Sequence, residues 1–482
     1  KDGKEVGTYT IDPTTGVITF QPNKDFTGTP DPAKVVAKDT NGTKVETTYT
    51  PTVTPVVPTA EPKETTGKQG QPQTQETESM FKQGDEVAPI DKTTVKLVDP
   101  SGNEVTTMPA LKDGKEVGTY TIDPTTGVIT FQPNKDFTGT PDPAKVVAKD
   151  TNGTKVETTY TPTVTPVTPT ADPAETTDIQ GKTQTGKPTF TPGADEVPMN
   201  DEVPATFEDG STEKVIPGEG TYTVAPDGTV TFTPEKTFTG KGTGVTVKRV
   251  DKNGTPVTAK YTPNVTPVTP TADPAETTDI QGKEQNGKPT FTPGNPEVPM
   301  DDEVPATFED GSTTKTIPGE GTYTVAPDGT VTFTPEKTFT GVGTGVTVKR
   351  VDKNGTPVTA KYTPTVTPVT PEGTPAETTD IQGKEQTGKP TFTPGNPEVP
   401  MDDEVPETFE DGSTTKTIPG EGTYTVAPDG TVTFTPEKDF VGKAKGVTVK
   451  RVDKNGTPVT ATYTPTVRPD TSFVDKDGNP LS

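Results

Sequence analysis

Hydrophobic and polar residues alternate along short stretches of this chain. In GTYTVAPDGTVTFTP, residues 321–335, Tyr323 and Val325 share one face before a Pro-Asp-Gly turn, and Val331 and Phe333 share one after it. Alternation with a period of two predicts half-buried strands. Proline presets φ for a turn and glycine accepts positive φ, so the stretch is expected to be a β-hairpin with a threonine exterior.

A second hairpin is predicted in GVTVKRVDKNGTPVTAKYTP, residues 345–364. Val346 and Val348 alternate with polar residues before an Asn-Gly turn, and Val358, Ala360 and Tyr362 alternate with them after it. Asn-Gly is a strong hairpin signal because both residues tolerate positive φ. Further strands are expected around Phe291, Phe308 and Ile317. About seven short strands with frequent turns are typical of a β-sandwich.

The ten tyrosines mark a repeat. They form two series, Tyr9, Tyr120, Tyr222, Tyr323 and Tyr424, and Tyr49, Tyr160, Tyr261, Tyr362 and Tyr463. The second series steps by 111 residues and then three times by 101, a spacing that is too long for a solenoid turn and fits a domain. The predicted fold is all-β, a tandem array of β-sandwich (Ig-like) domains of about 100 residues forming an elongated rod.

The repeat predicts the domain boundaries. We expect the C-terminal half of a repeat at 1–56, a longer variant at 57–167, full repeats at 168–268, 269–369 and 370–470, and the start of a non-repeat segment at 471–482. The extra residue of the longer variant is assigned to the turn 123–127, where it leaves the facing of both strands unchanged. Residues 363–380 are assigned partly to a last strand on a sheet edge, where proline is allowed, and otherwise to an extended, semi-rigid linker.

The amino-acid composition limits the kinds of functional site that the chain can form. The chain lacks Cys, His and Trp, which excludes disulfides, thiolate sites and the usual general base. A net charge of -25 argues against nucleic acid and anionic membranes as partners. No apolar run is long enough to span a membrane, and we expect secretion signal and anchor to lie outside a chain that begins with Lys1. No enzyme activity, cofactor or metal is expected.

Candidate structural residues are the aromatics of the two hairpins. They are Tyr222, Phe232, Tyr261, Tyr323, Phe333, Tyr362, Tyr424, Phe434 and Tyr463. Acidic clusters at 301–303 with 309–310, and at 402–404 with 410–411, have the oxygen ligands that calcium prefers, but no EF-hand spacing. Solvated loop charge is the favoured interpretation. Asp475 to Asn479 is assigned to a hairpin turn.

Three lysines raise the question of an internal crosslink. Lys236, Lys337 and Lys438 each lie two residues before a phenylalanine, which in strand phase places them on the inward side. A buried lysine beside a buried Asn could form an isopeptide bond. The alternative is a lysine at a strand end whose ammonium reaches water.

Several strings resemble a known repeat family. They are G-T-Y-T-V-x-x-D-G-T-V-T-F-T-P, then F-T-G, V-D-K-N-G and Y-T-P-T-V-T-P-V-T-P, together with G-K-Q-G-Q-P-Q at 67–73. They resemble the CshA-type fibril repeats of cell-wall-anchored fibrillar adhesins in streptococci and relatives. The resemblance implies repeats that hold a separate N-terminal region, which binds host fibronectin and partner microbes, away from the cell. Nothing in this chain matches that region.

The favoured hypothesis is therefore a structural stalk of a bacterial surface fibril, on the cell surface and anchored to the wall. Its expected partners are the neighbouring repeats of the same chain and, through the parent protein, host matrix protein or other bacteria. The alternative is that the repeats themselves are weak adhesion modules that gain avidity from repetition. A hydrolase is disfavoured, because near-identical units without His or Cys carry no distinct set of catalytic residues.

Overall fold

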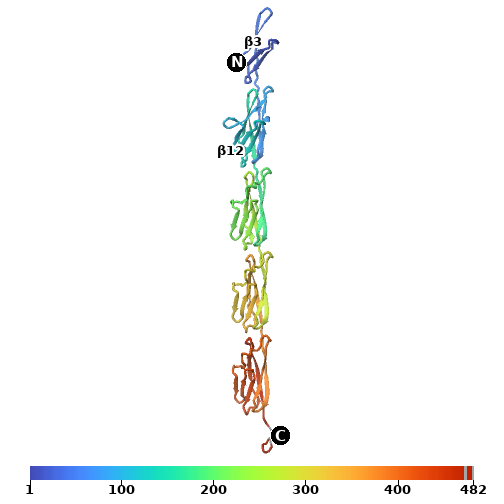
Figure 1. The fold of residues 1–482 in the computed structure, drawn as a ribbon, viewed down its shortest axis with the longest axis vertical. Helices are drawn as coiled ribbons and strands as arrows, with labels where there is room; N and C mark the ends of the chain where they lie inside the picture. Colours follow the sequence, from blue (N-terminus) through green and yellow to red (C-terminus); the bar gives the residue numbers. More distant parts are fainter. Residues whose placement is uncertain (472–474, 480–482) are drawn as a thin grey trace. The chain divides into compact units, whose positions relative to one another are not determined.

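The structure is a computed structural model that describes residues 1–471 and 475–479. Within this part of the chain the secondary structure is β-strand, apart from the three-residue 3-10 helix η1 (Glu78–Met80). Figure 1 shows the strands in sequence colours. The chain divides into an N-terminal unit (1–178, 182–234 and 240–265) and a C-terminal unit (179–181, 235–239 and 266–482). Each unit is described by itself.

The predicted repeat 269–369, in the C-terminal unit, shows the common plan. Its strands are β27 (Thr271–Asp273), β28 (Ala275–Ile280), β29 (Gln285–Gly287), β30 (Thr290–Thr292), β31 (Thr307–Phe308), β32 (Thr314–Ile317), β33 (Gly321–Val325), β34 (Val331–Pro335), β35 (Gly341–Val342), β36 (Val346–Val351) and β37 (Pro357–Thr367). One sheet has the order β28-β37-β36-β31, with β35 also paired to β37, and the other has the order β29-β34-β33-β32. Strands β27 and β30 form a small separate pair.

The other repeats reuse this plan. Repeat 370–470 has β38 (Glu372–Thr374), β39 (Ala376–Ile381), β40 (Gln386–Gly388), β41 (Thr391–Thr393), β42 (Thr408–Phe409), β43 (Thr415–Ile418), β44 (Gly422–Val426), β45 (Val432–Pro436), β46 (Gly442–Lys443), β47 (Val447–Val452) and β48 (Pro458–Arg468). Repeat 168–268 has β16 (Thr170–Asp172), β17 (Ala174–Ile179), β18 (Gln184–Gly186), β19 (Thr189–Thr191), β20 (Thr206–Phe207), β21 (Glu213–Ile216), β22 (Gly220–Val224), β23 (Val230–Pro234), β24 (Gly240–Lys241), β25 (Val245–Val250) and β26 (Pro256–Thr266).

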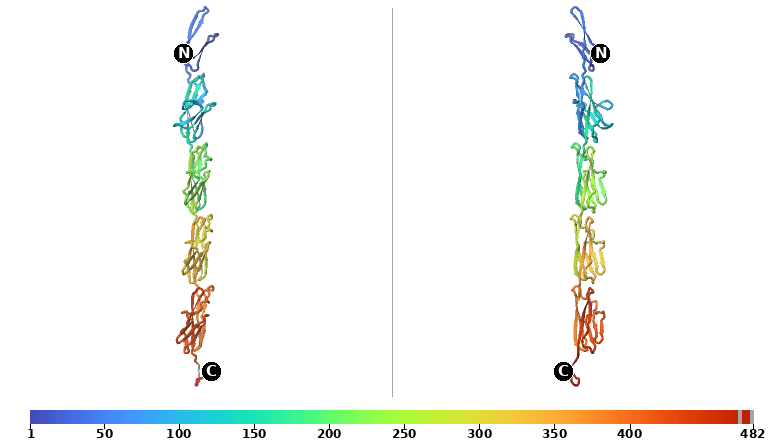
Figure 2. Two further views of the ribbon diagram at one scale, coloured as in Figure 1. Left: turned by 60° about the vertical axis from the view of Figure 1, so that its left-hand side comes forward. Right: turned by 180° about the vertical axis from the view of Figure 1, so that it is seen from behind.

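The longer variant, 57–167, and the half repeat lie in the N-terminal unit, which also contains most of repeat 168–268. The variant has β5 (Thr59–Ala60), β6 (Lys63–Lys68), β7 (Gln73–Glu76), β8 (Phe81–Lys82), β9 (Ile90–Val98), β10 (Glu104–Val105), β11 (Thr107–Lys112), β12 (Lys115–Ile122), β13 (Val128–Pro133), β14 (Ala144–Asp150) and β15 (Lys155–Thr165). The half repeat has β1 (Gly7–Ile11), β2 (Ile18–Pro22), β3 (Ala33–Lys38) and β4 (Lys44–Tyr49). The strands can be followed from two further sides in Figure 2.

Both predicted hairpins are confirmed. Tyr323 pairs with Phe333 in the first hairpin, and Val348 pairs with Ala360 in the second. In the longer variant Tyr120 still pairs with Phe131, so the extra residue lies in the turn as expected. The strand register is the same in both variants, because the extra residue lies outside the paired residues.

The predicted edge strand and linker are partly wrong. Residues 376–380 were assigned to the linker, yet they belong to β39, which pairs in parallel with β48. The equivalent strand β28 pairs in the same way with β37. Strand β37 is therefore interior and not an edge. Pro364 is tolerated in β37 because it lies between the residues that pair with β36 and those that pair with β35. Its carbonyl accepts a hydrogen bond from Gly343 N at 2.8 Å. The missing N–H of Pro364 faces the same break.

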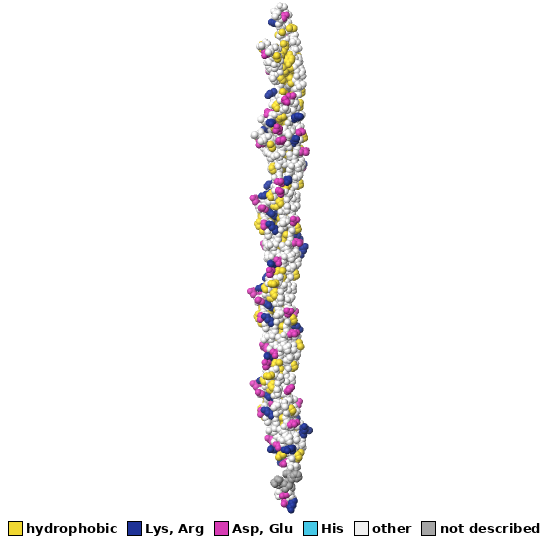
Figure 3. Space-filling model, turned by 90° about the vertical axis from the view of Figure 1, so that its right-hand side faces the viewer, with side chains coloured by type: hydrophobic (Ala, Val, Ile, Leu, Met, Phe, Trp, Pro, Cys, Tyr) yellow, Lys and Arg dark blue, Asp and Glu magenta, His cyan; other side chains and the backbone are white. Residues whose placement is uncertain are grey.

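The core lies between the two sheets. In repeat 269–369 it combines Phe308, Val348 and Tyr362 from one sheet with Tyr323 and Phe333 from the other. The chain is thus all-β, with sandwich repeats of about 100 residues in tandem. The half repeat 1–56 has no complete sandwich, and Ile11, Val36 and Val45 are at least half exposed. Some of the hydrophobic surface of this segment is visible at the top of Figure 3.

The predicted non-repeat segment 471–482 is only partly described. Residues 472–474 and 480–482 lie outside the described residues. In the described part, Asp475 N donates to Asn479 O at 2.8 Å and Gly478 N to Asp475 O at 3.0 Å, which defines a tight turn.

Candidate functional site

The predicted structural aromatics lie in the sandwich cores. Tyr222, Phe232, Tyr261, Tyr323, Phe333, Tyr362, Tyr424, Phe434 and Tyr463 are all completely buried. In repeat 269–369 the ring centroids of Tyr323 and Phe333 are 4.5 Å apart, and those of Tyr323 and Tyr362 are 6.4 Å apart across the two sheets. Tilted and edge-on aromatic contacts of this kind add to the stabilisation that burial alone provides.

A buried glutamate, which the sequence analysis missed, organises one end of this core. Glu320 Oε2 accepts a bond from Tyr323 Oη at 2.6 Å, and Oε1 accepts from Thr344 N and Thr344 Oγ1 at 2.8 Å each. Tyr323 Oη in turn accepts from Gly345 N at 3.1 Å. Burial, with the hydrogen bond to Glu320 adding to it, raises the pKa of Tyr323, so the phenol remains a donor.

The equivalent site in repeat 370–470 lacks the bond between tyrosine and glutamate, although Glu421 Oε1 still accepts from Lys445 N and Tyr424 Oη from Gly446 N. Ala444 and Lys445 stand where the preceding repeat has Gly343 and Thr344. A Cβ on Gly343 would lie 2.7 Å from Tyr323 Oη, so the alanine methyl group at 444 cannot coexist with the same tyrosine position. Glu421 Oε2 is buried there with no hydrogen-bond partner among the described residues. The steric clash between the Ala444 methyl group and the Tyr424 phenol therefore explains why Tyr424 donates no hydrogen bond to Glu421 Oε2.

A second buried carboxylate is specific to repeat 370–470. Glu407 is 4% exposed and replaces an alanine that is buried in the two preceding repeats at 205 and 306. Its Oε1 lies 3.1 Å from Arg451 Nε, but its Oε2 has no hydrogen-bond partner in the described part of the chain. Burial raises the pKa of Glu407, and the opposing charge of Arg451 only partly compensates. The folded state therefore favours the neutral form of Glu407 over the ionised form more than water does.

We expect Glu407→Ala to raise the free energy of unfolding of this repeat at pH 7 by about 1–3 kcal/mol, because the unsatisfied buried charge is removed. Arg451 keeps its 2.8 Å contact with Asp403. Since the pKa of Glu407 is higher in the folded state, its destabilising effect appears as pH rises through that pKa. The gain in stability from Glu407→Ala should therefore shrink as pH falls toward 4.

Calorimetry of the full chain at pH 7 and at pH 4 measures this gain, with the exposed Glu410→Ala as control. A variant no more stable at pH 7 would show that the Arg451 pair outweighs the burial cost.

The three lysines considered for a crosslink are not placed as expected. Lys236, Lys337 and Lys438 are exposed and lie in the turns that follow β23, β34 and β45. The inward placement was wrong because each strand ends at the proline two residues earlier, which breaks the strand phase. An exposed ammonium in a turn lacks the buried environment that the crosslink needs.

The acidic clusters pair with cations instead of with each other. Asp302 Oδ1 lies 2.8 Å from Arg350 Nη2, and Asp301 Oδ1 lies 3.4 Å from Lys353 Nζ. Asp310 Oδ1 accepts from Ser312 N and Oγ and so shapes its own turn. Among the described residues, no group of three or more acidic side chains is placed to hold a metal ion. On the face shown in Figure 3, charges of both signs are interspersed.

Consecutive repeats touch through two turns, and the same contact occurs inside each unit. In the C-terminal unit Asn455 Nδ2 donates to Gln281 O at 3.0 Å, and Lys283 Nζ lies 3.1 Å from Glu398 Oε2. Gly282 has φ +84°, and a Cβ there would lie 2.1 Å from Asn455 Oδ1. Glycine is thus required both by its conformation and by the close approach of the asparagine.

The N-terminal unit contains the matching contact. Asn253 Nδ2 donates to Gln69 O at 3.0 Å, and Lys68 Nζ lies 2.9 Å from Glu196 Oε2. A Cβ on Gly70 would lie 2.0 Å from Asn253 Oδ1. The sequence analysis had assigned Asn-Gly only to a hairpin turn. The contact partner, a Gln-Gly turn in the preceding repeat, could not be recognised from local sequence.

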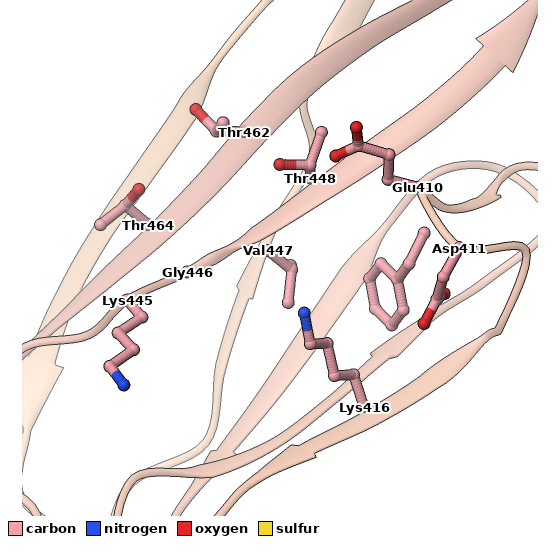
Figure 4. Close-up of a pocket in the computed structure, with 10 residues that line it drawn as sticks. Glu410, Asp411, Lys416, Lys445, Gly446, Val447, Thr448, Thr462 and Thr464 are labelled. Carbon is pink, nitrogen blue, oxygen red and sulfur yellow. The ribbon is translucent and has the colours of Figure 1, made fainter.

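A shallow polar hollow recurs at one position of three repeats. In repeat 370–470 it has a volume of about 420 Å³, and Figure 4 shows Lys416, Asp411, Thr448 and Thr462 around it. The equivalent hollows in repeats 168–268 and 269–369 have volumes of about 480 and 270 Å³. Their linings combine lysine, acidic and threonine side chains, and the rings of the phenylalanines nearby are buried in the core.

No helix in the described residues is long and apolar enough to cross a membrane. No curated protein matches the chain in sequence. Solved structures that resemble it are a protocadherin gammaB4 extracellular domain (12% identity, 97% of this chain and 82% of that chain, TM-score 0.31) and a tetra-tandem repeat in the extending region of a large adhesion protein (18%, 78% and 91%, TM-score 0.22). A third is Drosophila N-cadherin EC1-4 (11%, 78% and 92%, TM-score 0.21). At such TM-scores nothing about this chain follows from these similarities.

One family model covers nearly the whole chain. The model of the surface adhesin CshA repetitive domain matches residues 2–53, 55–164, 166–265, 267–366 and 368–467. These five matches leave only short gaps and the last residues unmatched. The chain therefore belongs to the surface adhesin CshA repetitive domain family.

Proposed function

We propose that this chain is a structural stalk of a bacterial surface fibril that carries a separate adhesive region away from the cell wall. The observation that carries the proposal is the parallel pairing of β28 with β37. The chain enters each such sheet at one end and leaves it at the other, so every added repeat adds length. The stalk would consist of the repeats 57–167, 168–268, 269–369 and 370–470, without enzymatic activity.

The repeated turn contact supports a stalk with defined joints. Asn253 and Asn455 make the same bond to the preceding repeat at the same distance. A joint that bonds two repeats restricts bending more than a free linker of equal length does. The anchor in the cell wall and the adhesive region belong to the proposal, and host matrix protein or other bacteria would be partners of the parent protein.

Small-angle scattering of the full chain tests the stalk. Strand β37 has 11 residues, or about 36 Å at roughly 3.3 Å per residue, so four repeats with their linkers should reach on the order of 160 Å. A compact globule of 482 residues would have a radius of gyration of only about 23 Å. The double variant Asn253→Ala, Asn455→Ala should broaden the distance distribution without unfolding the repeats. A maximum dimension near 60 Å would refute the stalk.

The recurring hollow favours a second candidate, a weak adhesion module in every repeat. Three equivalent copies could bind one large ligand with avidity even if each site is weak. Biosensor measurements with the immobilised full chain and host matrix proteins separate the two functions. Binding that disappears in the triple variant Lys214→Ala, Lys315→Ala, Lys416→Ala would favour the module, and absence of binding would favour the stalk alone.

A further inference from the structure

The first and last long strands of each repeat are direct neighbours. In repeat 269–369, β28 lies parallel to β37 in a continuous register of six pairs, from Ala275 with Tyr362 to Ile280 with Thr367. After the short strand β27, the chain enters this strand pair at the beginning of β28 and leaves it at the end of β37. These two points are at opposite ends of the strand pair. Tension along the chain therefore pulls the two strands past each other.

Side chains add bonds along the same strand pair. Thr277 Oγ1 contacts Tyr362 Oη at 2.5 Å and donates to Gln285 Oε1 at 2.6 Å. Gln285 Nε2 donates to Thr365 O at 3.0 Å. These groups are buried or partly buried. Water therefore competes little for the bonds while the strands remain paired.

Gln281 closes the pair at its far end. Its backbone N donates to Thr367 O at 2.8 Å, and its Oε1 accepts from Val369 N at 3.1 Å. Its Nε2 donates to Lys337 O at 2.8 Å, which ties the exit of the chain to the turn after β34 as well. The side chain is 5% exposed. One glutamine thus holds the residue at which the chain leaves the repeat.

The parallel strand pair and its closing glutamine also occur in repeats whose sequences differ elsewhere. In the longer variant, β6 and β15 form six parallel pairs, Thr65 contacts Tyr160, and Gln69 accepts from Val167 N at 3.1 Å. In repeat 370–470, β39 and β48 form six parallel pairs as well. There the Gln382 side chain accepts only a long bond of 3.5 Å from Asp470 N. The closing bond is therefore weakest in this last repeat.

We propose that the parallel pair of first and last strands is a load-bearing element that keeps each repeat folded under tension along the chain. Bonds that are perpendicular to the pulling direction are stretched together, so several must break in one event. Bonds at the end of a pair that is peeled apart break one after another. The load-bearing role rests on the proposed stalk function, because a stalk between a cell and its attachment point carries tension.

Single-molecule force spectroscopy on the full chain tests the element. The chain has no cysteine, so pairs of introduced cysteines define where the force is applied. Asp273→Cys with Thr370→Cys pulls β28 and β37 past each other, whereas Glu284→Cys with Thr370→Cys peels them apart from one end. All three positions are exposed. We expect a severalfold higher unfolding force for the first pair at equal loading rate, with equal thermal stability of both variants.

The unfolding event is recognised by its length. The first pair of attachment points lies 97 residue steps apart, so the unfolded segment has a contour length of about 350 Å at roughly 3.6 Å per residue. The gain in length on unfolding is this contour length minus the distance between the two points in the folded repeat. Gln281→Ala should lower the force in the first geometry, while Glu276→Ala, exposed on the same strand, should leave it unchanged.

Equal forces in the two geometries would refute the load-bearing element. The outcome is independent of the scattering test. An extended chain without directional resistance would retain the stalk and remove the load-bearing role. A compact chain with directional resistance would remove the stalk instead.

Discussion

Phe333→Ala is expected to lower the free energy of unfolding of repeat 269–369 by about 3–5 kcal/mol. The ring is completely buried between Tyr323 and Phe339, at centroid distances of 4.5 and 6.3 Å. Hydrophobic residues make up only 25% of the chain, so few side chains are available to fill the resulting cavity. Because a domain is typically stable by about 5–15 kcal/mol, this loss takes a large share of the total.

Calorimetry of the full chain measures the effect as one transition that moves to lower temperature. Thr334→Ala, at an exposed position on the same strand, is the matched control and should change stability by less than about 0.5 kcal/mol. If all transitions moved together, the repeats would unfold as one cooperative unit and not independently. A loss below about 1 kcal/mol would contradict the assignment of Phe333 to the core.

Glu320→Ala is the second substitution with a large expected effect, a destabilisation of about 2–6 kcal/mol. The substitution leaves Tyr323 Oη and Thr344 N without their acceptor inside the protein. Each buried donor without a partner costs about 1–3 kcal/mol. The shift of the corresponding unfolding transition measures the sum.

The chain contains its own control for this substitution. Glu421 occupies the equivalent position in repeat 370–470, but it accepts from Lys445 N while its Oε2 has no partner among the described residues. Glu421→Ala should therefore cost clearly less than Glu320→Ala. Equal losses would mean that the tyrosine bond contributes nothing. Restoring the bond with Ala444→Gly and Lys445→Thr should raise the cost of Glu421→Ala to that of Glu320→Ala.

The hairpins could be predicted because their signals are local. Tyr323 and Phe333 alternate with threonine on both sides of a Pro-Asp-Gly turn, and the pairing follows from the turn. The core tyrosines followed from the same alternation. The lysine placement failed for an equally local reason, since the strand before Lys337 ends at Pro335.

The parallel strand could not be predicted from local sequence. Strand β28, AETTDI, contains one strongly hydrophobic residue and directly follows Pro274, which is typical of a linker. Its partner β37 follows more than 75 residues later. The structural roles of Gln281 and Glu320 could not be predicted for the same reason. A polar side chain becomes structural only when distant residues bury it and satisfy its hydrogen bonds.

The short connection between repeats also protects the chain from misassembly. The sequence AETTDI occurs in three consecutive repeats, so β37 could in principle accept β39 of the next repeat in place of β28. Only residues 368–375 separate β37 from β39. A parallel neighbour needs a connection of about a dozen residues or more to return to the start of the strand. Eight residues cannot make that return, so β39 cannot take the place of β28 beside β37.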